Sequence, residues 1–125
     1  MKKTAIIFLV IICGIIFQVS GCSKANEEMF AARLCDTTAV QYSVDVVNIL
    51  TANCYSCHGE TTNAGSGGII LEGYTNLLQW ADNGYLIGNI THAPGYVPMP
   101  YGGGKLSDCE ISKIQAWIDQ GTKNN

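Results

Sequence analysis

The chain has 125 residues, which is enough for one small domain. It carries 7 basic and 10 acidic residues, a net charge of −3, and shows no basic patch in the expected domain. Proteins that bind nucleic acids usually present a basic surface, so this class is disfavoured.

The first 21 residues, 1–21, are predicted to be a signal peptide. Lys2 and Lys3 are followed by an almost unbroken apolar run over residues 5–17. This run is shorter than the roughly 18 to 20 residues needed to cross a bilayer, which is typical of a signal-peptide core.

The leader ends in Val-Ser-Gly followed by Cys22, which resembles the lipobox of bacterial lipoproteins. Cys22 would then be lipidated and become the new N-terminus, and the lipid would hold the protein on the extracytoplasmic side of a bacterial membrane. The alternative is an uncleaved anchor helix with an incidental cysteine, which gives the same location. Without residues 1–21 the chain has 5 basic and 10 acidic residues, a net charge of −5.

Residues 22–34 are polar and acidic and are predicted to form a flexible tether. Met29 lies in this tether, too far along the chain to be an iron ligand. The folded domain is expected at 35–125, with its last helix closing at Gly121. So short a domain often needs a cofactor or a cross-link to supplement its core.

A helix is predicted over 43–53. Ser43 is its candidate N-cap, and an apolar face at helical spacing is formed by Val46, Val47, Ile49 and Leu50. This helix would lead directly into the most informative segment of the chain.

That segment is Cys54-Tyr55-Ser56-Cys57-His58, whose pattern C-x-x-C-H is typical of covalent haem attachment. Cysteines three positions apart lie on one side of a helical turn, so both sulfur atoms can bond to the vinyl groups at one porphyrin edge. His58 is then held under the iron as the proximal nitrogen ligand. The sequence predicts one covalently bound haem c, anchored by Cys54 and Cys57.

Two other uses of these cysteines fit less well. A thioredoxin-like redox pair needs a surrounding βαβ pattern, which the sequence does not show. A structural zinc site needs four ligands, and the chain has no second C-x-x-C or H-x-x-x-H pair.

After His58 a glycine-rich loop is predicted, followed by short helices over 74–82 and 85–91. The first of these helices would end at Asn83-Gly84, with an inward face made of Leu77, Leu78 and Ala81.

The proline-punctuated loop 92–100 contains the candidate for the second iron ligand, Met99. Pro98 and Pro100 restrict the backbone on both sides of it. A methionine held this stiffly is poorly suited to filling gaps in a core and well suited to holding its thioether against iron. Two alternatives stay open: Met99 is an ordinary packed side chain, or His92 is the ligand, giving bis-histidine coordination and a lower potential.

The three glycines before Lys105 do not form a phosphate-binding loop. The spaced upstream glycine is missing, and Leu106 stands where Ser or Thr should follow the lysine.

The last predicted helix begins after a capping box formed by Ser107 and Glu110 and is ended by Gly121. Leu106 would form a hydrophobic staple with Ile111. An apolar stripe is expected from Ile111, Ile114 and Ile118, with Trp117 as a core residue at its edge.

Two of the six cysteines remain after these assignments, Cys35 and Cys109; Cys13 leaves with the leader. In an oxidising compartment such a pair is expected to be a disulfide. Closing so long a loop would stabilise the fold by roughly 4 kcal/mol. Two buried free thiols are the alternative.

The entry helix running into the C-x-x-C-H motif, the proline-flanked Met99 and the capped last helix with Trp117 resemble class I c-type cytochromes. The stretch 95–107 is similar to that of small monohaem lipoprotein cytochromes, and the resemblance covers 35–121. It implies an all-α, cytochrome c-like fold, with a few short helices and loops wrapped around one haem. By this resemblance Cys54 and Cys57 are the thioether anchors, and His58 and Met99 the proximal and distal ligands. The pair Cys35 and Cys109 is not part of the general pattern of that class; a bridge would join the segment before the entry helix to the start of the last one.

With both axial positions filled by protein, the expected function is a membrane-tethered electron carrier rather than an enzyme. No nucleophile, acid–base pair or second cofactor motif accompanies the haem site. Redox partner proteins would meet an exposed haem edge in brief, weak encounters. The alternatives are a haem-based gas sensor or small-molecule binder, and a bis-histidine electron-transfer subunit of a larger oxidoreductase.

Overall fold

The computed structural model describes residues 35–125, which form a compact unit of their own. The predicted signal peptide, the lipidation site Cys22 and the tether with Met29 lie outside the described residues. Within 35–125 the chain is helical and has no strand, which agrees with an all-α fold.

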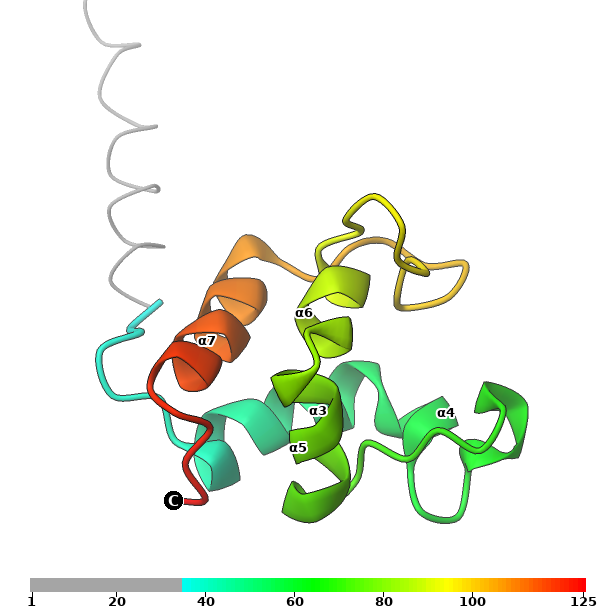
Figure 1. The fold of residues 1–125 in the computed structure, drawn as a ribbon, viewed down its shortest axis with the longest axis horizontal. Helices are drawn as coiled ribbons and strands as arrows, with labels where there is room; N and C mark the ends of the chain where they lie inside the picture. Colours follow the sequence, from blue (N-terminus) through cyan, green and yellow to red (C-terminus); the bar gives the residue numbers. More distant parts are fainter. Residues whose placement is uncertain (1–34) are drawn as a thin grey trace, which may run out of the picture. The chain divides into compact units, whose positions relative to one another are not determined.

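The described helices, in chain order, are η1 (Tyr42–Val46), α3 (Val47–Asn53), α4 (Tyr55–His58), η2 (Asn63–Ser66), α5 (Tyr74–Asp82), α6 (Tyr85–Ile90) and α7 (Asp108–Asp119). The first two run on without a break, so the helix expected over 43–53 is confirmed to within a residue. The helices expected over 74–82 and 85–91 are confirmed as α5 and α6. α7 contacts both η1 and α6, and Figure 1 shows α7 beside α6 and α4 beyond the end of α3.

One apolar core lies between these helices. Its five largest fully buried side chains come from four different elements: Val46, Leu50, Leu77, Ile114 and Trp117. Fully burying a large apolar side chain contributes about 1.5–3 kcal/mol, so these contacts account for much of the association between the helices. Trp117 is 0 % exposed, so the expectation that it is a core residue is confirmed.

Ser43 is not the N-cap of the first helix. The helix begins one residue earlier, after Gln41, and no cap side chain accepts a bond there. The free N–H groups find other partners: Gln41 donates to Asp45 Oδ2 at 3.0 Å, and Tyr42 and Ser43 donate to the Asn125 side-chain and main-chain oxygens, each at 2.9 Å. The first helix is therefore capped largely by a residue more than 80 positions away.

The ends of α7 follow the sequence expectation closely. Ser107 accepts a bond from the Glu110 N–H, and the Glu110 side chain accepts one from the Ser107 N–H, which completes the capping box. At the other end Gly121 has a φ of 89°, and the bonds Gly121 N to Ile118 O and Thr122 N to Trp117 O form a Schellman motif.

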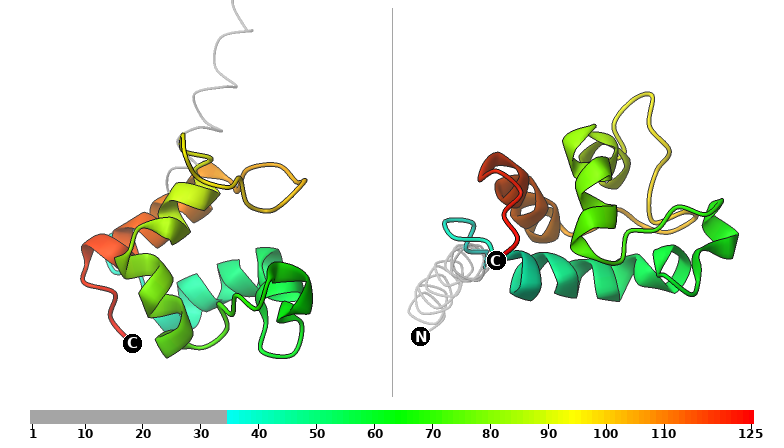
Figure 2. Two further views of the ribbon diagram at one scale, coloured as in Figure 1. Left: turned by 45° about the vertical axis from the view of Figure 1, so that its right-hand side comes forward. Right: turned by 60° about the horizontal axis from the view of Figure 1, so that its bottom comes forward.

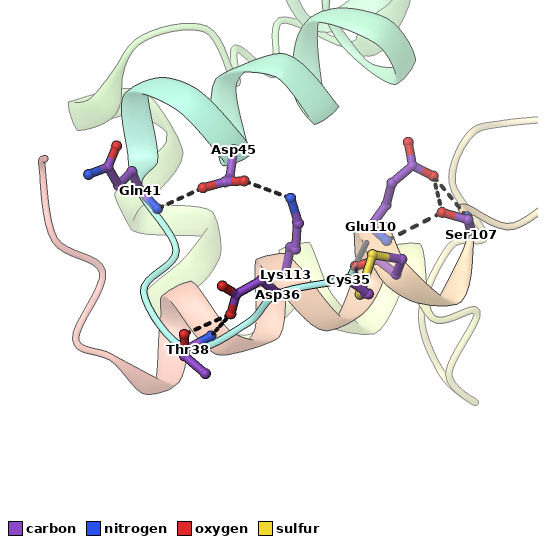
Figure 3. A network of polar contacts seen from close by, with 9 residues as sticks. Cys35, Asp36, Thr38, Gln41, Asp45, Ser107, Glu110 and Lys113 are labelled. Carbon is purple, nitrogen blue, oxygen red and sulfur yellow. Dashed lines mark hydrogen bonds and ion pairs between the residues drawn. A yellow bond between two sulfur atoms is a disulfide. The ribbon is translucent and has the colours of Figure 1, made fainter. Parts of the chain in front are cut away.

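The predicted disulfide between Cys35 and Cys109 is present, with the two Cα atoms 5.5 Å apart. It ties the start of the domain to the first turn of α7. A second link between the same parts is the ion pair between Lys113 Nζ and Asp45 Oδ1, 2.7 Å long (Figure 3). The two connections fix α7 against the beginning of the entry helix.

Candidate haem-binding site

The attachment motif forms a single helical turn. The Cys54 N–H still bonds to Leu50 O of α3, while its own carbonyl accepts the N–H groups of Cys57 at 3.0 Å and His58 at 2.9 Å. Cys54 and Cys57 are both free thiols, the first half-buried and the second exposed. The two sulfurs and the imidazole therefore belong to one rigid turn, as covalent attachment of a planar macrocycle requires.

His58 is fixed by a main-chain contact that the sequence did not reveal. Its Nδ1 lies 3.1 Å from the carbonyl oxygen of Ile69. A carbonyl only accepts, so Nδ1 carries the proton, and Nε2 of the neutral ring keeps its lone pair. A histidine that ligates a metal usually has its other nitrogen bonded in this way.

The loop after His58 holds that carbonyl in place. Ser66 Oγ donates to the same Ile69 oxygen at 3.0 Å, and Leu71 N donates to His58 O at 2.8 Å. Gly59 is buried where the loop begins, and a Cβ there would lie 2.7 Å from Thr62 Oγ1 and 2.8 Å from Tyr55 O. Any residue other than glycine at position 59 would displace one of these two oxygen atoms.

Burial raises the pKa of the Cys54 thiol to about 11, with a further contribution from the nearby Glu110 carboxylate. At neutral pH almost none of this thiol is the reactive thiolate. Thiol–disulfide exchange, the alternative use of a C-x-x-C pair, therefore has a poor nucleophile at Cys54.

Both main-chain groups of Met99 are bonded to the segment around the end of α6. Its N–H donates to Asn89 O at 3.1 Å, and its carbonyl lies 3.0 Å from His92 Nε2. The loop also packs against α6. The ring of Tyr96 lies so close to Gly88 that a Cβ added there would be only 2.4 Å from it. Met99 itself is half-buried.

Two buried polar atoms have no hydrogen-bond partner within residues 35–125: Trp80 Nε1 on α5 and Asn89 Oδ1 on α6. A buried polar atom left unpaired costs about 1–3 kcal/mol, so each implies a missing partner. A haem carries two carboxylates, which are acceptors of the kind that the Trp80 indole N–H lacks. The residues present fit a haem through two thiols and an oriented imidazole on one turn, and through a methionine whose main chain is held by two hydrogen bonds.

Figures 1 and 2 show how these parts are arranged. The segment from α4 to η2 and the loop from His92 to Gly104 both extend from the side of the domain away from the C-terminus. Cys54, Cys57 and His58 lie on the turn that forms α4. His92 and Met99 are joined within the loop, and Cys35 and Cys109 are joined by the disulfide.

Nowhere among residues 35–125 do three or more His, Cys, Asp or Glu side chains gather to hold a metal ion. A site built on a haem needs fewer, since the porphyrin occupies four positions on the iron. In the same residues no helix is long and apolar enough to cross a membrane. No protein-family model, curated protein or solved structure matches this chain.

Two contributors to the site were missed at the sequence level: the main-chain carbonyls of Ile69 and Asn89. Both act through the main chain, for which no residue type is a signal. Trp80 and Asn89 lie on predicted helices, and only the tertiary structure shows that their polar atoms are buried without partners.

Proposed function

We propose that this protein is a monohaem cytochrome c that carries single electrons between redox partners. When bound, the haem iron supplies a one-electron couple between its ferric and ferrous states. The proposal includes the fold-level likeness to class I cytochromes c, with helices and loops surrounding the haem, and it is not an enzymatic role.

The observation that carries the proposal is the geometry of His58. It stands on the same turn as two free thiols, and its Nδ1 is bonded to the Ile69 carbonyl so that Nε2 is left as a ligand. A histidine in a structural role needs no such combination. The three residues have the chemistry and spacing of a covalent haem anchor with a proximal ligand.

Met99 is the better candidate for the distal ligand, and His92 the weaker one. His92 Nε2 is already bonded to Met99 O, and that bond would have to break before this nitrogen could bind iron. Met99 is bonded only through its main chain, which leaves its thioether free. A soft thioether opposite His58 favours the ferrous state and raises the potential relative to two histidines.

In this proposal the N-terminal lipid on Cys22 keeps the domain at a bacterial membrane, on its extracytoplasmic side. A net charge of −5 for the chain after its leader favours partners with a positive docking surface.

The first test is the visible spectrum of the chain produced with haem-maturation machinery. We expect sharp, split ferrous bands and a weak far-red ferric band that is absent in Met99→Ala and retained in His92→Ala. Haem without that band would instead favour His92 as the ligand or a gas-binding site, and ready binding of carbon monoxide by the untreated ferrous protein would identify the second. Absence of covalent haem would overturn the proposal.

A further inference from the structure

The loop that carries Met99 has very few ways to be held in place. Pro98 and Pro100 have no N–H, so Met99 supplies the one main-chain donor among residues 98–100. Its N–H is bonded to Asn89 O at 3.1 Å and its carbonyl to His92 Nε2 at 3.0 Å.

His92 occupies a costly backbone conformation. Its φ is 56°, in the left-handed region that favours glycine, and the only other described residue except glycine with a positive φ is Thr122, at 46°. An L-residue is disfavoured there relative to glycine. Histidine is among the residues other than glycine that are enriched in this region, and here its ring also bonds to the Met99 carbonyl.

From this geometry we infer that His92 is a positioning residue: it holds Met99 on the iron by donating a hydrogen bond to the Met99 carbonyl. The inference rests on the proposed function, because it concerns the ligand of that haem. Since a carbonyl only accepts, the ring must carry a proton on Nε2.

The remaining contacts of the loop explain why one bond matters. Ala93 N donates to Gly88 O at 3.0 Å, and the ring of Tyr96 packs on Gly88. These contacts fix the loop as far as Tyr96, whereas Val97 and Pro98, which lead to Met99, are exposed. His92 is the side chain that reaches from the anchored start of the loop to Met99 itself.

The test compares three variants of the haem-loaded protein. His92→Gly removes the ring and also relieves the positive φ; His92→Gln keeps a side-chain N–H donor of similar reach. Thr122→Gly is the matched control, because it relieves the other positive φ away from this loop.

Imidazole is the probe, added to the ferric protein until the far-red band of methionine ligation is lost. If the His92 bond is worth a typical hydrogen bond, His92→Gly should bind imidazole about 5- to 10-fold more tightly than the wild type. His92→Gln and Thr122→Gly should remain within about twofold of it.

Amide hydrogen exchange at Met99, measured in the ferrous protein, is a second readout that does not depend on iron ligation. It should be about 5- to 10-fold faster in His92→Gly alone. Unchanged imidazole affinity and exchange in His92→Gly would overturn the inference, and so would a His92→Gln variant that behaves like His92→Gly.

The outcomes separate this inference from the proposed function. A wild-type protein without the far-red band refutes methionine ligation, whatever the variants do. In that case the exchange rate of the Met99 amide still decides whether His92 fixes the loop.

Discussion

Gly59 lies where the chain turns away from the attachment helix towards Ile69, the residue whose carbonyl orients His58. Its φ is −79°, which any residue can adopt, so the need for glycine here is steric. A Cβ would collide with Thr62 Oγ1 and with the main-chain oxygen of Tyr55. The orientation of His58 therefore depends on the absence of a side chain at Gly59.

We expect Gly59→Ala to lower the free energy of unfolding of the haem-loaded protein by about 2–3 kcal/mol, because a backbone oxygen must move. Denaturant unfolding followed at the haem absorbance measures this. Gly65→Ala in the same loop is the control, since a Cβ there meets nothing within 4 Å. Equal losses in the two variants would contradict the steric account.

The two thiols of the motif differ in environment, and their reactivity should differ accordingly. In the chain produced without haem, iodoacetamide should label the exposed Cys57 at least about tenfold faster than Cys54 at pH 8, because a pKa of about 11 leaves roughly one Cys54 thiol in a thousand ionised. Peptide mass spectrometry after timed labelling gives both rates. Equal rates would show that Cys54 is not buried as the structure has it.

At the scale of elements, the first turn of α7 does more than cap its own helix. Glu110 Oε2 accepts bonds from the Ser107 N–H and hydroxyl, while Glu110 Oε1 accepts one from Asn53 Nδ2 at 3.0 Å. Asn53 immediately precedes Cys54. One carboxylate thus joins the start of α7 to the end of α3, next to the attachment turn.

Removing this carboxylate should therefore cost more than removing the cap alone. Ser107→Ala is expected to lower the free energy of unfolding by about 1 kcal/mol, and Glu110→Ala by about 2 kcal/mol, since the second change also breaks the link to Asn53. Ser112→Ala, at an exposed position within α7, should change it by less than about 0.5 kcal/mol. Chemical denaturation at pH 7 ranks the three, and similar losses for Ser107→Ala and Glu110→Ala would refute the linking role.

At the scale of the whole domain, long-range connections hold α7 to the entry helix. The Cys35–Cys109 disulfide spans 74 residues and the Asp45–Lys113 pair spans 68. The hydrogen bond from Lys113, followed by that from the Gln41 N–H, lowers the pKa of the Asp45 carboxyl below its usual 3.8. Figure 3 shows Asp45 between these two donors.

The sign of this shift predicts how stability depends on pH. A carboxyl whose pKa is lower in the folded state stabilises the fold above its unfolded value of 3.8, and this contribution is lost as the pH falls towards the folded value. In a double-mutant cycle with Asp45→Asn and Lys113→Gln, the coupling energy should be about 1 kcal/mol at pH 7. It should fall towards zero below pH 3.8, and a coupling that does not change with pH would contradict the assignment.

Local signals in the sequence determined much of the fold. The bounds of α5, α6 and α7, the capping box and the glycine after α7 depend on residues within a few positions of one another, and the structure has them as expected. The turn formed by Cys54, Cys57 and His58 was also predictable from neighbouring residues, because the spacing of residues along a helix decides which side chains share a face. The pairing of Cys35 with Cys109 followed from counting the cysteines that had no other use.

Only the tertiary structure decided the contacts between distant segments. Asn125 caps the first helix in place of Ser43, Asn53 bonds to Glu110, and the Ile69 carbonyl orients His58. Main-chain groups carry two of the bonds that matter most to the site, from His58 to Ile69 and from His92 to Met99. Every residue has the same carbonyl, so residue identity does not specify its partner; the path of the folded chain brings the two together.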